Sequence, residues 1–79
     1  MITEKILNTL KVQFTKTNEN SFDIPDVGGT IIEETKDLFF VHGNRTIKIL
    51  KNHPNIKKYI EAYVTGFDEF EEAIKNIRN

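Results

Sequence analysis

Residues 56–77 read IKKYIEAYVTGFDEFEEAIKNI, and their apolar side chains recur with a regular spacing. Steps of four and three residues alternate along the series, whose members are Ile56, Ile60, Tyr63, Phe67, Phe70, Ile74 and Ile77. Because an α-helix has about 3.6 residues per turn, this spacing places all of these side chains on one helical face. The segment therefore predicts a helical layer that buries its apolar face against another part of the chain.

A glycine in the middle of this segment leaves two interpretations open. Thr65 and Gly66 are typical of a helix end, and Asp68 with Glu71 would then form a capping box for a second helix. The apolar spacing nevertheless crosses Gly66 without losing phase, which also fits one long kinked helix. At the start of the segment, Pro54 is favoured in the first helical position, where a missing N–H is not needed.

The N-terminal segment also has helical spacing. Thr3 is placed to act as its N-cap. The polar residues 17–21 predict a turn or loop after it. The apolar residues on the predicted helical face are Ile2, Ile6, Leu7 and Leu10.

Three later segments have the composition of β-strands: residues 30–32, residues 38–41 and Arg45–Leu50. Gly43 and Asn44 between the last two are typical of a two-residue hairpin turn. Ser21–Ile24 could form a further short edge strand that ends at Pro25, because proline has no N–H to donate. The sequence thus predicts one α+β domain over residues 1–79. It consists of an N-terminal helix, a three-stranded antiparallel meander, and one or two C-terminal helices packed on one face of the sheet.

Composition excludes several classes of protein. The chain of 79 residues has no cysteine, which excludes disulfide bonds, thiolate metal sites and thiol nucleophiles. No apolar run approaches the ~20 residues of a membrane span, and the N-terminus lacks the apolar region of a signal peptide. We therefore expect a cytoplasmic protein that does not associate with membranes.

Catalytic and ligand-binding motifs are missing from the sequence. The two histidines, His42 and His53, have no carboxylate at a diagnostic spacing. Neighbouring strand residues such as Glu33 and Glu34 point to opposite faces and cannot form an acid/base pair by themselves. No metal-binding pattern or phosphate-binding glycine loop is present. We expect a protein that is not an enzyme and that has no metal or cofactor.

Charge is divided along the chain although the net charge is only −1. Residues 1–44 carry four lysines against seven acidic groups, residues 45–66 carry five basic groups against one acidic group, and residues 67–79 carry two basic groups against four acidic ones. The central basic strip predicts a nucleic-acid-binding function as one alternative, because such cations engage phosphates. Its members are Arg45, Lys48, Lys51, Lys57 and Lys58, together with His53.

The C-terminal segment carries a second pattern, in which amphipathic helix positions precede an acidic cluster. These positions are Ile56, Lys58, Tyr59, Ile60, Ala62, Tyr63, Gly66 and Phe67, followed by Asp68, Glu69, Glu71 and Glu72. The pattern and the order of the predicted elements resemble small phage-encoded anti-CRISPR proteins of the Cas9-inhibitor type. The resemblance implies an acidic mimic of DNA that binds a CRISPR effector and prevents it from engaging its target.

The leading hypothesis is therefore a non-enzymatic protein-binding module, an inhibitor from a phage or mobile element that acts on a larger protein. The resemblance implies an acidic binding face, made of Asp68, Glu69, Glu71 and Glu72, with Glu33, Glu34 and Asp37 on the hairpin next. The nucleic-acid-binding strip over residues 45–58 is the alternative. A homodimer that uses surplus apolar helix surface is a third hypothesis.

Overall fold

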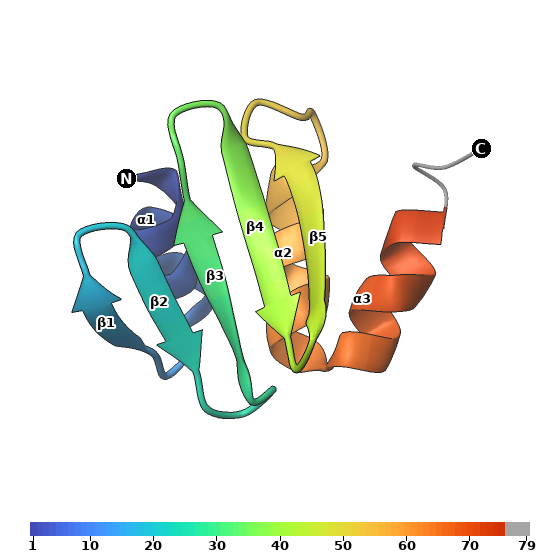
Figure 1. Ribbon diagram of the computed structural model, residues 1–79, viewed down its shortest axis with the longest axis horizontal. Helices are drawn as coiled ribbons and strands as arrows, with labels where there is room; N and C mark the ends of the chain where they lie inside the picture. Colours follow the sequence, from blue (N-terminus) through green and yellow to red (C-terminus); the bar gives the residue numbers. More distant parts are fainter. Residues whose placement is uncertain (76–79) are drawn as a thin grey trace.

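Three helices and five strands make up the computed structural model, which describes residues 1–75 (Figure 1). The predicted N-terminal helix, antiparallel sheet and C-terminal helices are all confirmed. In chain order the elements are α1 (Ile2–Leu10), β1 (Thr15–Asn18), β2 (Ser21–Ile24), β3 (Gly29–Glu33), β4 (Asp37–His42), β5 (Arg45–Leu50), α2 (Ile56–Thr65) and α3 (Phe67–Ile74).

The sheet has five strands rather than the predicted three, in the order β1-β2-β3-β4-β5. Every strand pairs antiparallel with its neighbour in the sequence. The prediction of a turn or loop over residues 17–21 is wrong at both ends, because the turn contains only Glu19 and Asn20. The prediction of Ser21–Ile24 as an edge strand is also corrected, since β2 lies between β1 and β3.

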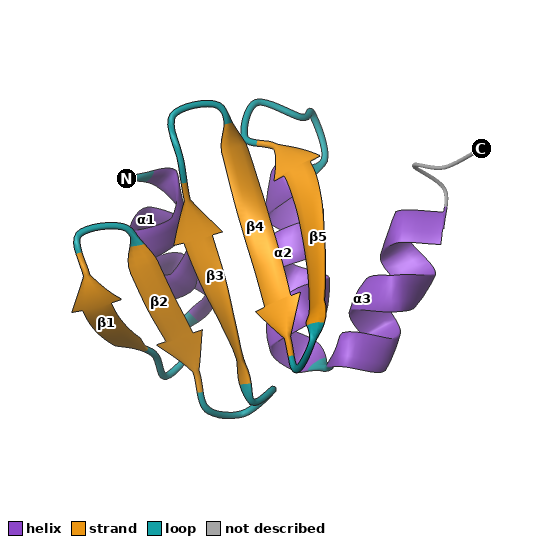
Figure 2. Cartoon of the chain, viewed as in Figure 1, coloured by secondary structure: helices purple, strands orange, loops and turns teal. Residues whose placement is uncertain are grey.

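The helices α1 and α2 form a second layer on one face of the sheet (Figure 1). In Figures 1 and 2, α1 and α2 lie behind the strands, and α3 lies beside the outer strand β5. Alternate strand residues point toward the helices and are buried. The core consists of Phe22, Ile24, Ile31, Leu38, Phe40 and Ile49 from the sheet, and of Leu7, Tyr59, Ile60, Tyr63, Phe70 and Ile74 from the helices.

The C-terminal segment forms two helices, which decides between the two interpretations of its sequence. Gly66 adopts an extended conformation, with φ 168° and ψ 153°, and separates α2 from α3. The predicted capping box is wrong: α3 has no side-chain cap, and Asp68 and Glu71 both lie inside the helix. Of the predicted apolar face, Ile56 and Phe67 are only partly buried, and Ile77 lies outside the described residues.

Two other helix starts also differ from the prediction. Pro54 is not the first helical residue, because Asn55 is the N-cap of α2 and the helix begins at Ile56. Thr3 is not an N-cap but the second residue of α1, and Met1 occupies the cap position without a side-chain hydrogen bond. The beginning of α1 must therefore obtain its hydrogen-bond partners from elsewhere in the fold.

Candidate interaction surfaces

The C-terminal helix α3 is anchored through its aromatic side. Phe67 stacks on His42 of β4, with ring centroids 4.3 Å apart and an interplanar angle of 11°. The Arg45 guanidinium lies over the same Phe67 ring, 5.2 Å from its centroid. Phe70 packs against Phe40, with a centroid distance of 4.6 Å. These contacts hold the start of α3 at the β4–β5 hairpin and fix which side of the helix faces outward.

The outer side of α3 carries exposed carboxylates. Asp68, Glu69 and Glu72 are exposed, and their spacing of three and four residues places them on one side of the helix. Glu72 pairs with Lys75 at 2.6 Å, and Glu71 forms an ion pair with Arg45. Asp68 and Glu69 have no ion-pair partner within residues 1–75. We call Asp68, Glu69 and Glu72 the α3 acidic side.

The other residues of the predicted acidic face are Glu33, Glu34 and Asp37. They lie at the opposite end of β4 from the hairpin where α3 begins (Figure 1). Glu33 is buried, and its carboxylate accepts a hydrogen bond from the Thr3 N–H at 3.0 Å and pairs with Lys51 at 3.2 Å. Glu34 is exposed and accepts a hydrogen bond from the Asn20 side-chain amide at 2.8 Å. Asp37 is half-buried at the start of β4. The predicted acidic residues therefore form two separate groups.

The environment of Glu33 perturbs its pKa. Burial alone raises the pKa of this carboxyl group, but the hydrogen bond from the Thr3 N–H and the nearby Lys51 ammonium outweigh it and hold the pKa below its ordinary value. Glu33 thus stays charged and serves as the missing N-terminal hydrogen-bond partner of α1. Its carboxylate is fully engaged inside the protein.

The members of the predicted basic strip come from β5, where Lys48 is exposed, from the connection that follows it, and from the start of α2. Arg45 and Lys51 lie at opposite ends of β5, about 20 Å apart for six residues of extended chain, and each is paired with a glutamate. Lys57 and Lys58 are exposed in the first turn of α2. His53 uses its Nδ1 atom to accept the Asn55 N–H at 3.0 Å. Arg45 therefore lies apart from Lys51, and both of these cations already have an anionic partner within the described chain.

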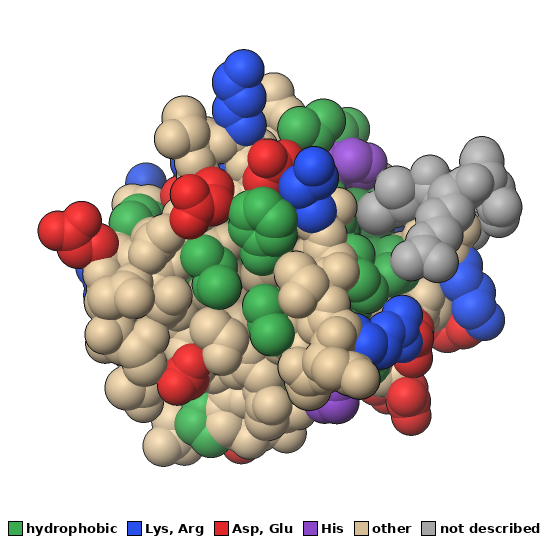
Figure 3. Space-filling model, viewed as in Figure 1, with side chains coloured by type: hydrophobic (Ala, Val, Ile, Leu, Met, Phe, Trp, Pro, Cys, Tyr) green, Lys and Arg blue, Asp and Glu red, His purple; other side chains and the backbone are tan. Residues whose placement is uncertain are grey.

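The open face of the sheet is a surface that the sequence analysis did not identify. Ile32, Phe39 and Val41 point away from the helices and remain half-exposed, with Ile32 and Phe39 directly opposite each other on β3 and β4. Figure 3 shows hydrophobic side chains gathered over the middle of this face. The sequence does indicate this apolar surface at residues 38–41, because four consecutive apolar residues give a strand two apolar faces.

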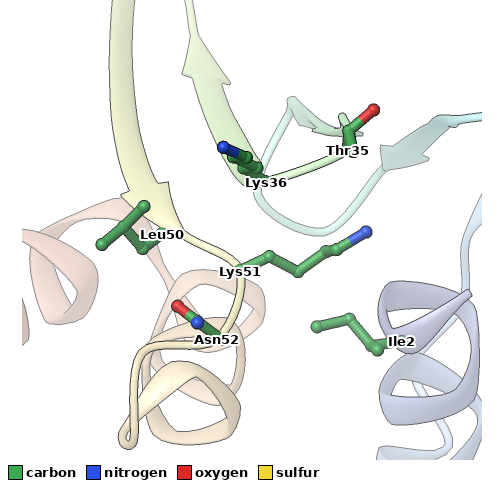
Figure 4. A pocket seen from close by; sticks show the side chains of 6 residues that line it. All are labelled: Ile2, Thr35, Lys36, Leu50, Lys51 and Asn52. Carbon is green, nitrogen blue, oxygen red and sulfur yellow. The ribbon is translucent and has the colours of Figure 1, made fainter.

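An open pocket lies where the end of β5 approaches α1 and the β3–β4 connection (Figure 4). Its volume is about 570 Å³. Leu50, one of its lining residues, is 56% exposed, which is high for a large apolar side chain. The residues around the pocket are Ile2, Thr35, Lys36, Leu50, Lys51 and Asn52.

Residues 1–75 contain no group of three or more histidine, cysteine, aspartate or glutamate side chains placed to hold a metal ion. None of the helices in this part of the chain is both long and apolar enough to cross a membrane. No family model, curated protein or solved structure matches the chain.

Proposed function

We propose that this protein is a non-enzymatic protein-binding module that engages a larger partner through the α3 acidic side. The observation that supports the proposal is the division of α3 into two sides. Aromatic contacts fix one side to the sheet, so that Asp68, Glu69 and Glu72 are held outward in a defined arrangement. Because the helix backbone is already fixed, only the side chains of these residues lose conformational freedom when a basic surface binds them.

The partner that best fits this surface is a protein with a basic, nucleic-acid-binding groove. Closely spaced carboxylates on a rigid helix can occupy sites that otherwise bind phosphates, and the attraction between opposite charges accelerates association. Together with the resemblance to anti-CRISPR proteins, this leads us to propose an inhibitor from a phage or mobile element, with a CRISPR effector as its target. Glu34 and Asp37 form a separate acidic group, and Glu33 is engaged internally.

The test compares two double variants that change the net charge equally. Asp68→Lys with Glu69→Lys reverses charge on the α3 acidic side, whereas Glu19→Lys with Asp26→Lys reverses two exposed carboxylates in the turns beside β2. The tagged proteins are used to capture partners from a bacterial lysate, with and without nuclease treatment. Binding to a purified guide-loaded CRISPR effector is then measured directly.

We expect a protein partner that survives nuclease treatment, is lost with the α3 variant and is retained with the control variant. Inhibition of DNA binding by the effector should follow the same order. Equal binding by both double variants would contradict the role of α3. Partners that disappear with nuclease would instead support the nucleic-acid-binding alternative, with Lys48, Lys57 and Lys58 as the exposed cations to mutate.

A further inference from the structure

The outer edge of β5 is an unpaired strand edge in the part of the chain that the structure describes. β5 ends the strand order of the sheet and pairs only with β4. The Lys51 N–H donates to the Lys36 carbonyl at 2.7 Å. This hydrogen bond determines which residues of β5 direct their backbone groups toward β4. Because hydrogen-bonded pairs alternate along antiparallel strands, Ile47 and Ile49 bond toward β4. The backbone groups of the residues between them must point away from the sheet.

Three residues therefore present backbone groups to the outside. The N–H groups of Thr46, Lys48 and Leu50 and the carbonyls of Thr46 and Lys48 face outward, and no backbone hydrogen bond within residues 1–75 engages them. The Leu50 carbonyl is already used, because it accepts the His53 N–H at 3.0 Å. Such a row of donors and acceptors is the template to which another strand can add.

The two flanks of this edge differ in chemistry. On the open face, Lys48 is exposed and has no carboxylate partner among the described residues, and Leu50 lies two positions further along at the rim of the pocket described above. On the helical side, a cleft of about 100 Å³ separates β5 from α3 and is lined by Arg45, Glu71, Ile74 and Lys75. Side chains of an added strand would alternate between these two flanks.

A second copy of the chain fits this edge poorly. If the β5 strands of two copies paired antiparallel about a two-fold axis, their outward-facing residues would have to lie opposite one another. The register that pairs all three of these residues places Thr46 opposite Leu50 of the second copy. In that register Lys48 lies directly opposite Lys48 of the second copy, and like charges in directly opposed positions destabilise a strand pair. Lysine at a strand edge commonly prevents self-association in this way. The same ammonium group attracts a strand that carries a carboxylate.

We propose that the β5 edge is a docking site for an extended segment of a partner protein, which adds to the sheet as a sixth strand. The segment carries an aspartate or glutamate opposite Lys48 and an apolar residue two positions away, against Leu50 and the adjoining pocket. The residue between them points to the helical side of the sheet, the side on which the cleft beside α3 lies. Backbone hydrogen bonds hold the segment, and Lys48 with Leu50 selects its sequence. This site is separate from the α3 acidic side and does not depend on it.

The proposal is tested by selecting peptides of about ten residues, long enough for one strand, from a randomised display library on the folded protein. Two variants act as controls. Thr46→Pro removes an outward N–H and places the proline ring where the new strand would lie, and it breaks no bond to β4. Lys48→Glu keeps the backbone edge and reverses the charge. Thermal unfolding of each variant shows whether the fold is retained.

We expect enriched peptides with an acidic residue two positions from an apolar one. Their binding should be lost with Thr46→Pro and weakened about fivefold with Lys48→Glu, and exchanging the peptide's acidic residue for lysine should restore binding to the Lys48→Glu variant. Peptide binding should also slow amide hydrogen exchange at Thr46 and Lys48. If the Thr46→Pro variant does not fold, two other measurements test the proposal. These are the binding of the lysine-containing peptide to the Lys48→Glu variant and the amide hydrogen exchange of Thr46 and Lys48.

Three results would overturn the proposal. The first is a selection that yields no common sequence. The second is a set of enriched peptides that bind the folded Thr46→Pro variant as tightly as the native protein. The third is unchanged amide exchange on β5 in the presence of a bound peptide, which would place the binding site elsewhere on the surface.

Discussion

Glu33 is a single buried side chain that connects three parts of the molecule. It belongs to β3, it accepts the Thr3 N–H at the beginning of α1, and it pairs with Lys51 just after β5. Since α1 has no side-chain cap from its own N-terminal residues, this carboxylate takes over the capping function across the fold. A negative charge at this position also interacts favourably with the helix dipole.

Replacing this carboxylate should therefore cost stability in a pH-dependent way. We expect Glu33→Gln to lower the free energy of unfolding by about 2 kcal/mol at neutral pH, as for hydrogen bonds to a charged group. The folded-state pKa of Glu33 lies below its ordinary value of 4.5, so its contribution is present above that pH and is lost as the pH falls through the folded-state pKa. Urea unfolding over a pH series should show the difference between native protein and variant shrinking in acid.

The neighbouring residue provides the control for this experiment. Glu34→Gln makes the same chemical change on the exposed side of the chain and should alter the free energy of unfolding by about 0.5 kcal/mol or less. Equal effects of the two substitutions would contradict the capping role. The sequence shows that Glu33 and Glu34 face opposite ways. Only the position of α1, thirty residues earlier in the chain, decides which of them is buried.

Tyr63 leads to a second prediction about a single residue, which concerns the stability of the protein at alkaline pH. Its buried hydroxyl donates to the Val41 carbonyl, and burial, aided by the Asp23 carboxylate, raises the pKa of Tyr63 from 10.0 to about 12. The unfolded chain then releases this proton before the folded protein does, so stability falls between pH 10 and pH 12 by about 2–3 kcal/mol. Tyr63→Phe should cost about 1 kcal/mol at pH 8.

Denaturant unfolding of both proteins across the alkaline range separates this effect from the titration of the lysines and the other tyrosine. The lysines and Tyr59 are common to both proteins, so their contribution cancels in the difference. We expect the advantage of the native protein over Tyr63→Phe to shrink above pH 10 and to become a disadvantage by pH 12, because the loss of about 2–3 kcal/mol exceeds the ~1 kcal/mol advantage at pH 8. A difference that stays constant up to pH 12 would show that the Tyr63 hydroxyl is not protected from ionisation.

At the scale of elements, two glycines at the ends of elements differ in whether their position has room for a larger side chain. A Cβ on Gly29, at the start of β3, would collide with the Tyr63 hydroxyl and the Val41 carbonyl, and neither atom can move freely. A Cβ on Gly66, between α2 and α3, would meet only the end of the flexible Glu69 side chain at 2.5 Å. The sheet thus depends on its glycine for close packing, whereas the helix junction does not.

We accordingly expect Gly29→Ala to destabilise the protein by about 2 kcal/mol or more, as overpacked sites do. Gly66→Ala should change the free energy of unfolding by about 0.5 kcal/mol or less, because the extended backbone at this position suits any residue. Paired thermal and urea unfolding measurements check both values. A strongly destabilised Gly66→Ala variant would show that the junction requires glycine after all.

The strands differ in how well the pattern of apolar residues in the sequence predicts them. β3, β4 and β5 contain apolar or β-branched residues and are found at their predicted places, including the two-residue turn in which Gly43 has φ 60°. β1 reads TKTN and is exposed at every position, so no apolar alternation indicates it. Its strand conformation comes from pairing with β2, and Lys16 on it is bonded to Glu4 of α1 at 3.2 Å.

The free edge of β5 predicts an alternating pattern of amide exchange in the isolated protein. Thr46 and Lys48 direct their N–H groups to solvent, whereas Ile47 and Ile49 donate to β4. Hydrogen exchange followed by NMR should show fast exchange at Thr46 and Lys48 and protection at both isoleucines. Protection at all four positions would mean that the edge is already covered in solution.

For the whole molecule, the layered arrangement explains why candidate sites are harder to predict than elements. The apolar spacing of residues 56–77 determines that a helical layer exists, and α2 and α3 confirm it. Whether two charged residues share a surface depends on which ends of the strands meet, as with Arg45 and Lys51 at opposite ends of β5. Ion pairs within the protein, which no spacing reveals, further engage charged groups that would otherwise be available to a partner.

The same arrangement leads to a prediction about the state of association of the whole protein. The structure exposes an unpaired edge and a half-exposed apolar sheet face, yet Lys48 stands at the centre of that edge. We expect the native chain to sediment as a monomer over a wide concentration range, because self-pairing along β5 would bring two ammonium groups together. Lys48→Ile removes this repulsion and adds a β-branched residue, so this variant should associate as its concentration rises.

Lys57→Ile makes the matched change on α2, away from the strand edge, and should leave the protein monomeric. Sedimentation of these three proteins and of the Lys48→Glu variant distinguishes the possibilities. Association of Lys48→Ile alone locates the self-pairing surface at the edge of β5 and assigns to Lys48 the role of preventing it. If the native chain already dimerises and Lys48→Glu leaves that dimer unchanged, the homodimer forms through another surface, and Lys48 does not serve to keep the β5 edge open for a different partner.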